Sequence, residues 1–145
     1  MRPSPARSAT SRLTIYALCA LGGPVGAWVL GRSGHLLANN ACQTSGWLVL
    51  LLVAPVAEEI IFRLGVHSHV QRHLTRQWGW LSLANLASAA LFGLTHALVQ
   101  SAPLALWVAL PAVLFGLVWE ISGKRIAAPV ALHAWYNACL VIASC

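Results

Sequence analysis

The stretch WLVLLLVAPVAEEIIFR, from Trp47 to Arg63, decides how this chain is interpreted. It is apolar except for Glu58, Glu59 and Arg63 at its end, although the whole chain of 145 residues has only three acidic residues and no Asp. A charged side chain at the centre of a bilayer costs at least ~2.5 kcal/mol, so an acid inside a membrane helix is a functional-site hypothesis. The alternative is that both acids only hold helices together through Arg63, but one Arg cannot neutralise two Glu.

The composition of the whole chain indicates a membrane protein. Hydrophobic residues make up 59% of it and charged residues only 8%, whereas a soluble domain carries roughly 25% charged residues. We therefore predict one all-α domain over residues 1–145, a polytopic bundle of transmembrane helices. The net charge of +6 does not indicate nucleic acid binding, because the basic residues lie in short segments between apolar runs, where they set topology.

Five apolar segments have close to the ~20 residues that a helix needs to cross a bilayer. A basic tail, residues 1–12, precedes the first of them. The first apolar segment resembles a signal peptide, but no clear cleavage site follows it, so we interpret it as a retained helix. Arg and Lys concentrate in alternate links, which predicts a cytosolic tail, the N-terminus inside and the C-terminus outside. The predicted helices are 13–30, 46–64, 80–98, 102–121 and 126–143.

The charged residues of the second segment are spaced for two different roles. Glu59 and Arg63 are four residues apart with the acid first, which is the favourable order for an ion pair on a helix. Glu58 lies about 100° around the helix from Glu59 and does not share its face. We therefore expect Glu59 and Arg63 to shape a site and Glu58 to remain free for chemistry.

Two further segments carry polar residues one helical turn apart. Phe92 and His96 lie late in the third segment, and His133 and Asn137 lie in the fifth. A single His on an apolar helix is more often a packing residue than a catalyst. Two His, an Asn and an unpaired Glu on three helices can, however, satisfy one another around a small wet cavity. The carboxylate could take a proton from water, one His could hold that water, and the other His and the amide could stabilise an oxyanion.

The ordered motifs EExxxR, FxxxH and HxxxN resemble the CAAX protease and bacteriocin-processing (CPBP) family of glutamic-type intramembrane endopeptidases. Each motif alone is weak, but the ordered set is specific. The resemblance implies that Glu58 is the water-activating acid, that His96 is its partner, and that His133 and Asn137 form the oxyanion site. It also implies that no metal or other cofactor is required.

The resemblance covers residues 53–140, and it includes the segment Gly116–Glu120, which is similar to the family's stretch before the last helix. We take residues 46–143 as the core that carries the motifs. The chain is shorter than most members and looks most like the short sorting-system type paired with JDVT-CTERM proteins. The resemblance thus implies a protease of the bacterial inner membrane that contacts lipid and cleaves a transmembrane or lipid-anchored protein, for instance at a C-terminal sorting signal. It does not indicate an oligomeric state.

Contact between these residues makes a demand on helix length. His96 lies about 24 Å along its helix, at 1.5 Å per residue, whereas Glu58 lies only about 10 Å before Gly65. The two side chains meet if the second helix continues through Val66–Leu74, which contains neither Pro nor Gly. His133 lies only about 10 Å into the fifth helix, so we expect that helix to begin inside the bilayer.

Several alternatives remain open at this stage. The same two acids and two His could bind a metal such as zinc, which accepts these ligands. A non-catalytic membrane binding or immunity protein could keep the same fold, whereas transport is disfavoured by the lack of an internal repeat. A second group of His is most simply interpreted as a solvated helix end; its members are His67, His69 and His73.

Two smaller features concern serine and cysteine chemistry. Gly31-Arg32-Ser33-Gly34, followed by His35, matches the GxSG motif of rhomboid-like serine proteases, but it lies in a polar link rather than at the start of a buried helix. Aspartyl intramembrane proteolysis is excluded, because the chain has no Asp. The four Cys show no metal-binding spacing, although Cys42 and Cys145 could share an oxidising face and form a disulfide.

Overall fold

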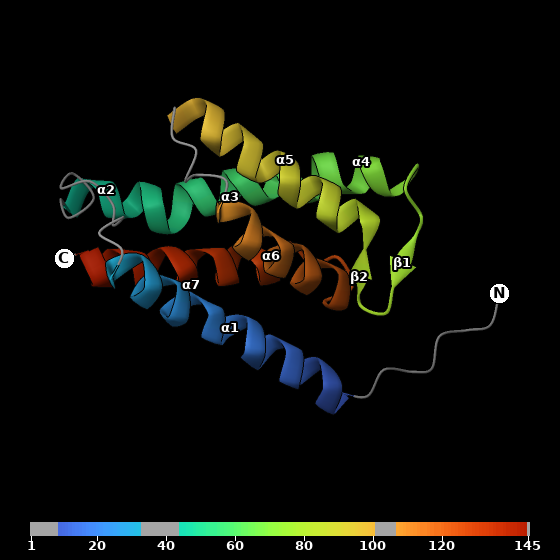
Figure 1. Cartoon of the computed structure of the whole chain (residues 1–145), viewed down its shortest axis with the longest axis horizontal. Coiled ribbons are helices and arrows are strands. Elements are labelled where there is room, and N and C mark those ends of the chain that lie inside the picture. The colour runs from blue at the N-terminus through green and yellow to red at the C-terminus, as the bar shows by residue number, and fades with distance from the viewer. Residues whose placement is uncertain (1–8, 33–43, 101–106, 145) are drawn as a thin grey trace.

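A computed structural model describes residues 9–32, 44–100 and 107–144, which form a bundle of helices (Figure 1). Five continuous helices are present in this part of the chain, as predicted. One of them, which we call the long helix, spans residues 44–71 and consists of five consecutive segments. The elements are α1 (Ala9–Arg32); the long helix with α2 (Thr44–Leu48), η2 (Val49–Val53), α3 (Ala54–Glu59), η3 (Ile60–His67) and α4 (Ser68–Gln71); and α5 (Leu83–Gln100), α6 (Ala109–Ile121) and α7 (Ala127–Ser144).

The long helix continues past Gly65, as contact between the sequence motifs requires, but it ends at Gln71, three residues before the expected Leu74. Its two segments η2 and η3 are π-helical, so the backbone N–H of a residue bonds to the carbonyl five residues earlier instead of four. In the first, the N–H of Ala54 bonds to the carbonyl of Val49. Pro55 follows directly and has no N–H, so the regular hydrogen-bond ladder is interrupted there.

A small β-hairpin separates the long helix from α5, and the sequence-based prediction missed it. β1 (Gln77–Trp78) pairs antiparallel with β2 (Leu81–Ser82), and β2 lies at the start of the predicted helix 80–98. Gly79 in the connecting turn has a φ of +59°, a conformation that favours glycine in two-residue hairpin turns. The hairpin delays the start of α5 to Leu83.

α7 lies between α1 and the long helix, α5 lies on the other side of the long helix, and α6 packs against α5, α7 and α1 (Figure 1). α6 takes part in both apolar clusters of the core. One cluster joins α6 to the long helix and α5, and consists of Phe62, Ala89, Phe92 and Ala112. The other joins α6 to α1 and α7, and consists of Cys19, Phe115, Val118 and Leu132.

The turn between α6 and α7 is sharp. α6 ends in a Schellman motif, in which the N–H of Gly123 bonds to the carbonyl of Glu120 and the N–H of Lys124 bonds to that of Trp119. Gly123 has a φ of +74°, which a residue with a side chain rarely adopts. The turn allows α7 to run antiparallel to α6 after only a few residues.

Most basic residues of the described segments lie in elements at one end of the bundle, namely Arg12, Arg72, Arg76, Lys124 and Arg125. The start of α1, the hairpin and the turn between α6 and α7 all lie at the same end in Figure 1. Lys124 Nζ donates a hydrogen bond of 2.8 Å to Gln71 Oε1 across this end. The placement agrees with the charge pattern from which we predicted an inside N-terminus.

Within the described residues, α1 and α7 are each long and apolar enough to cross a membrane, and α5 and α6 are apolar but shorter. Five spans therefore remain a prediction. Cys19 and Cys139 are buried and free. The Ser33 motif with His35, the Cys42–Cys145 pair and part of the predicted fourth helix lie outside the described residues.

Candidate active site

Glu59 and Arg63 form a buried ion pair in the middle of the bundle. Arg63 Nε lies 2.7 Å from Glu59 Oε2, and both side chains are 0% exposed. Arg63 Nη2 also donates to the carbonyl of Ala112 in α6, at 3.2 Å. The pair therefore joins the long helix to α6, and its i, i+4 spacing is the one from which we predicted it.

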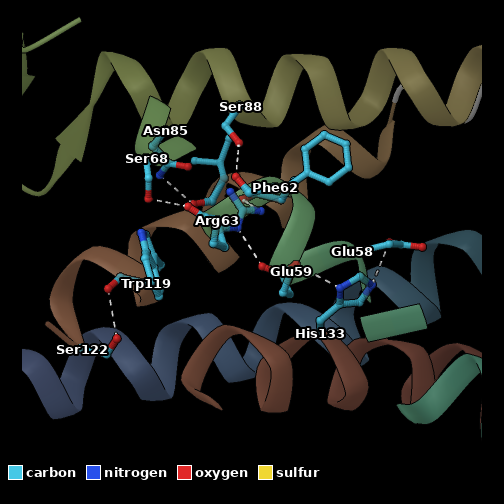
Figure 2. A network of polar contacts seen from close by, with 12 residues as sticks. Glu58, Glu59, Phe62, Arg63, Ser68, Asn85, Ser88, Trp119, Ser122 and His133 are labelled. Carbon is cyan, nitrogen blue, oxygen red and sulfur yellow. Dashed lines mark hydrogen bonds and ion pairs between the residues drawn. The ribbon is translucent and has the colours of Figure 1, made fainter. Parts of the chain in front are cut away.

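His133 of α7 lies between the two acids, as Figure 2 shows. Its Nδ1 is 3.0 Å from Glu59 Oε1, and its Nε2 is 3.7 Å from Glu58 Oε2. An ionised carboxylate only accepts hydrogen bonds, so Nδ1 carries the hydrogen of the bond to Glu59. The ring stacks on Phe115, with 4.7 Å between centroids, which fixes its plane.

His96 of α5 also lies near Glu58. Its Nε2 lies 3.8 Å from Glu58 Oε2, and its Nδ1 is 2.9 Å from the carbonyl of Phe92, one turn earlier. A carbonyl only accepts, so Nδ1 is the donor, and Nε2 of the neutral ring is left as an acceptor that faces the carboxylate. The ring of Phe92 lies beside both histidine rings. Its centroid is 4.3 Å from the ring centroid of His96 and 6.0 Å from that of His133.

The side chain of Glu58 is more exposed than that of Glu59. Its side chain is 28% exposed and that of His96 is 21% exposed, whereas that of Glu59 is 0% exposed. Both contacts of Glu58 to ring nitrogens are longer than a hydrogen bond. The carboxylate therefore lies near two histidines but is hydrogen-bonded to neither of them.

Depth along the helices explains why these residues meet. Glu58 lies 13 residues before Gln71, and His96 lies 13 residues after Leu83, so both are about 20 Å from the end of the bundle that carries the hairpin. His133 lies only six residues, or about 9 Å, into α7. α7 must therefore start deeper in the bundle than α4 ends.

Asn137 faces the long helix but is engaged with its backbone. Its Nδ2 donates a hydrogen bond of 2.8 Å to the carbonyl of Leu50, in η2. One of the two N–H groups of the amide is thereby used, and the other remains for a further bond. The oxyanion role that the resemblance implied for Asn137 stays a prediction.

A second buried polar cluster was missed by the sequence analysis. Glu120 Oε1 accepts a hydrogen bond from the hydroxyl of Ser82 and lies 3.1 Å from Nε2 of His67. The interpretation of His67 as part of a solvated helix end is wrong, since its side chain is 0% exposed. Its spacing of four residues from Arg63 places it on the buried face, and this is the feature that could have revealed it. His69 and His73 are exposed, as expected.

Asn85 of α5 and Gly116 of α6 surround the far side of Arg63 (Figure 2 shows Asn85 beside it). Asn85 Nδ2 donates to the carbonyl of Val113 at 2.9 Å. A Cβ atom at Gly116 would overlap Asn85 Oδ1 and lie 3.0 Å from Arg63 Nη1. Gly116 is therefore the residue that lets the guanidinium and the amide approach the backbone of α6.

The described part of the chain contains no set of side chains arranged as metal ligands. Among residues 9–32, 44–100 and 107–144, no group of three or more His, Cys, Asp or Glu side chains is arranged to hold a metal ion. The structure instead brings Glu58, Glu59, Arg63, His96 and His133 together from three elements of the bundle, the long helix, α5 and α7.

Comparison with known families identifies the family of the chain. The family model of the type II CAAX prenyl endopeptidases, Rce1-like, matches residues 40–139, and the chain belongs to this family of membrane proteases. The matched region contains all three motifs and excludes α1. No curated protein and no solved structure matches the chain. The family confirms the resemblance found in the sequence, and with it a membrane protein with the fold of a CAAX-type protease.

Proposed function

We propose that this protein is a glutamic-type intramembrane endopeptidase, in which Glu58 and His96 activate a water molecule without a metal. The observation that carries the proposal is the position of Glu58. Its Oε2 lies 3.8 Å from Nε2 of His96, and it keeps 28% of its side-chain surface exposed. Family membership supports the general activity, and this pair of residues supports the mechanism.

The pair is suited to hold and deprotonate water. With Nδ1 of His96 donating to the carbonyl of Phe92, its Nε2 accepts hydrogen bonds, and so does the carboxylate of Glu58. A water molecule that donates one hydrogen to each acceptor has its oxygen lone pair directed away from both. As that oxygen attacks a peptide carbonyl carbon, Glu58 takes the proton as general base.

His133 is placed to stabilise the oxyanion that forms. Its Nε2 lies 3.7 Å from Glu58 Oε2, while Glu59 and Phe115 hold the ring. In this role both ring nitrogens carry a hydrogen. The positive charges of His133 and Arg63 then together balance the negative charges of the two carboxylates. When the C–N bond breaks, the proton taken from water passes to the leaving amine, and Glu58 is a carboxylate again.

The substrate and location follow from the resemblance and from the apolar surroundings of the site. We propose a transmembrane or lipid-anchored protein as substrate, cleaved for instance at a C-terminal sorting signal as in JDVT-CTERM systems. The enzyme would lie in the bacterial inner membrane with its N-terminus inside, as the alternating charges of its links suggest.

The test is proteolysis in detergent of co-expressed, C-terminally anchored proteins from the same genome. Glu58→Gln keeps the shape of the side chain but removes the base, and we expect the cleavage rate to fall by about 10²-fold or more at unchanged protein abundance. His96→Gln should behave alike. His69→Gln is the matched control, because that histidine is exposed and belongs to none of the three motifs. Full activity of Glu58→Gln would refute the glutamic mechanism, and loss of wild-type activity in chelator would refute metal independence.

A further inference from the structure

Two helices of the bundle contain a proline that leaves a backbone carbonyl without its regular partner. In α1, Pro24 has no N–H, so the carbonyl of Ala20, four residues earlier, loses its helical hydrogen bond. In the long helix, the N–H of Ala54 bonds back to Val49, and the next residue is Pro55. The carbonyl that the N–H of residue 55 would have reached in the same pattern is that of Leu50.

α7 lies between these two helices and supplies a donor to each carbonyl (Figure 1 shows α7 between them). Trp135 Nε1 donates to the carbonyl of Ala20 at 2.9 Å. Asn137 Nδ2 donates to the carbonyl of Leu50 at 2.8 Å. Two residues along a helix correspond to a rotation of about 200°, so the two side chains point to opposite sides of α7. The same short segment therefore compensates for both prolines.

The hydrogen bond of Asn137 connects the two parts of the active site. Asn137 lies one turn after His133 on α7, and Leu50 lies eight residues before Glu58 on the long helix. Each partner is thus on the same helix as a residue of the proposed chemistry. Holding Leu50 against Asn137 fixes the rotation and the height of the long helix relative to α7, and thereby the 3.7 Å separation of Glu58 from His133.

We infer that Asn137 is a positioning residue, which aligns the long helix with α7 by capping the carbonyl that Pro55 leaves free. The inference rests on the proposed function and deepens it. It gives Asn137 a task that its contact with Leu50 already fulfils before any substrate binds. An unpaired carbonyl in the bundle would otherwise be costly, since no water is available in the hydrocarbon region to satisfy it.

The experiment is a double-mutant cycle between positions 137 and 55, measured as cleavage rate at equal amounts of folded protein. We expect Asn137→Ala alone to lower the rate by about 10²-fold, the order of loss that a misalignment of about 1 Å can cause. Pro55→Ala restores an N–H at position 55, so the carbonyl of Leu50 regains a backbone donor. In the Pro55→Ala background, Asn137→Ala should then lower the rate by less than about 10-fold.

Pro24→Ala is the matched control. It also removes a proline from a helix. The carbonyl that Pro24 leaves free is that of Ala20, which is capped by Trp135, so the substitution should not rescue Asn137→Ala. Thermal denaturation of the same variants in detergent gives a second measure of coupling, which is readable even if Pro55→Ala lowers the rate by itself. Asn137→Ala should lower the melting temperature in the wild-type background and much less in the Pro55→Ala background.

Equal losses of rate and of melting temperature from Asn137→Ala in both backgrounds would overturn the inference, because Asn137 would then act on the substrate and not on Leu50. Glu58→Gln is assayed beside the cycle. If it remains inactive, failure of the rescue concerns Asn137 alone, whereas full activity of Glu58→Gln would reject the proposed function itself.

Discussion

The buried pair of Glu59 and Arg63 allows a quantitative prediction about stability. The ionic groups are 2.7 Å apart and 0% exposed, and within the described residues the guanidinium has a further hydrogen bond only to the carbonyl of Ala112. Glu59→Leu removes the carboxylate and leaves the guanidinium buried without its counter-charge. Breaking a buried pair in this way costs about 3–5 kcal/mol. His133 loses its Nδ1 partner in the same variant.

Glu58→Gln is the matched control, because it changes the adjacent acid. Glu58 makes no contact shorter than 3.7 Å to the two histidines and is partly exposed, so we expect the free energy of unfolding to fall by less than about 1 kcal/mol. The double variant Glu59→Leu/Arg63→Met should regain most of the loss, since an apolar replacement of a whole buried pair is often neutral.

The assay is denaturant titration of the purified protein in detergent, combined with the abundance of each variant in membranes. Glu59→Leu and Arg63→Met should each lower both quantities more than Glu58→Gln does. Equal unfolding free energies for Glu59→Leu and Glu58→Gln would show that the pair does not stabilise the fold. A double variant that is less stable than either single variant would contradict the reasoning about the unpaired charge.

Two further predictions follow from the packing and from the charges. Gly116→Ala should destabilise the protein by about 1–3 kcal/mol, because the added Cβ overlaps Asn85. Gly65→Ala, with open space at its Cβ, should be neutral or stabilising by up to about 1 kcal/mol in the same denaturation assay; equal effects of the two would contradict this account. The location of most basic residues in elements at one end of the bundle, opposite the C-terminus, predicts that a C-terminal reporter enzyme is active only outside the cytoplasm. A reporter active only in the cytoplasm would reverse the proposed orientation.

Much of the bundle could be predicted from hydrophobic length and spacing. The i, i+4 rule placed Glu59 beside Arg63, and helical rise per residue required the long helix to pass Gly65 if Glu58 was to meet His96. Both features are present, with the helix ending at Gln71 and the two side chains 3.8 Å apart. These inferences worked because they depend on distances within one helix, which its regular geometry fixes.

The features that were missed either are too short to form a pattern or depend on contacts between distant segments. The hairpin before Leu83 has strands of two residues, too short for an alternating pattern. His67 is buried because Glu120, 53 residues later, lies against it. Phe115, which orients His133, is one of many apolar residues in its helix and has no local feature to distinguish it. Periodicity identifies a buried face, but not the polar partner that meets it.

Asn137 shows the same limit at the centre of the site. The HxxxN spacing places its amide on the side of His133, and this much the sequence predicts. Its partner exists only because Pro55, 82 residues earlier, follows a wide helical turn and leaves the carbonyl of Leu50 free. A motif spacing can therefore serve two purposes at once. The four-residue interval that brings an amide near the proposed catalytic histidine also places it where it can fix the neighbouring helix, and the Pro55→Ala rescue separates these two uses.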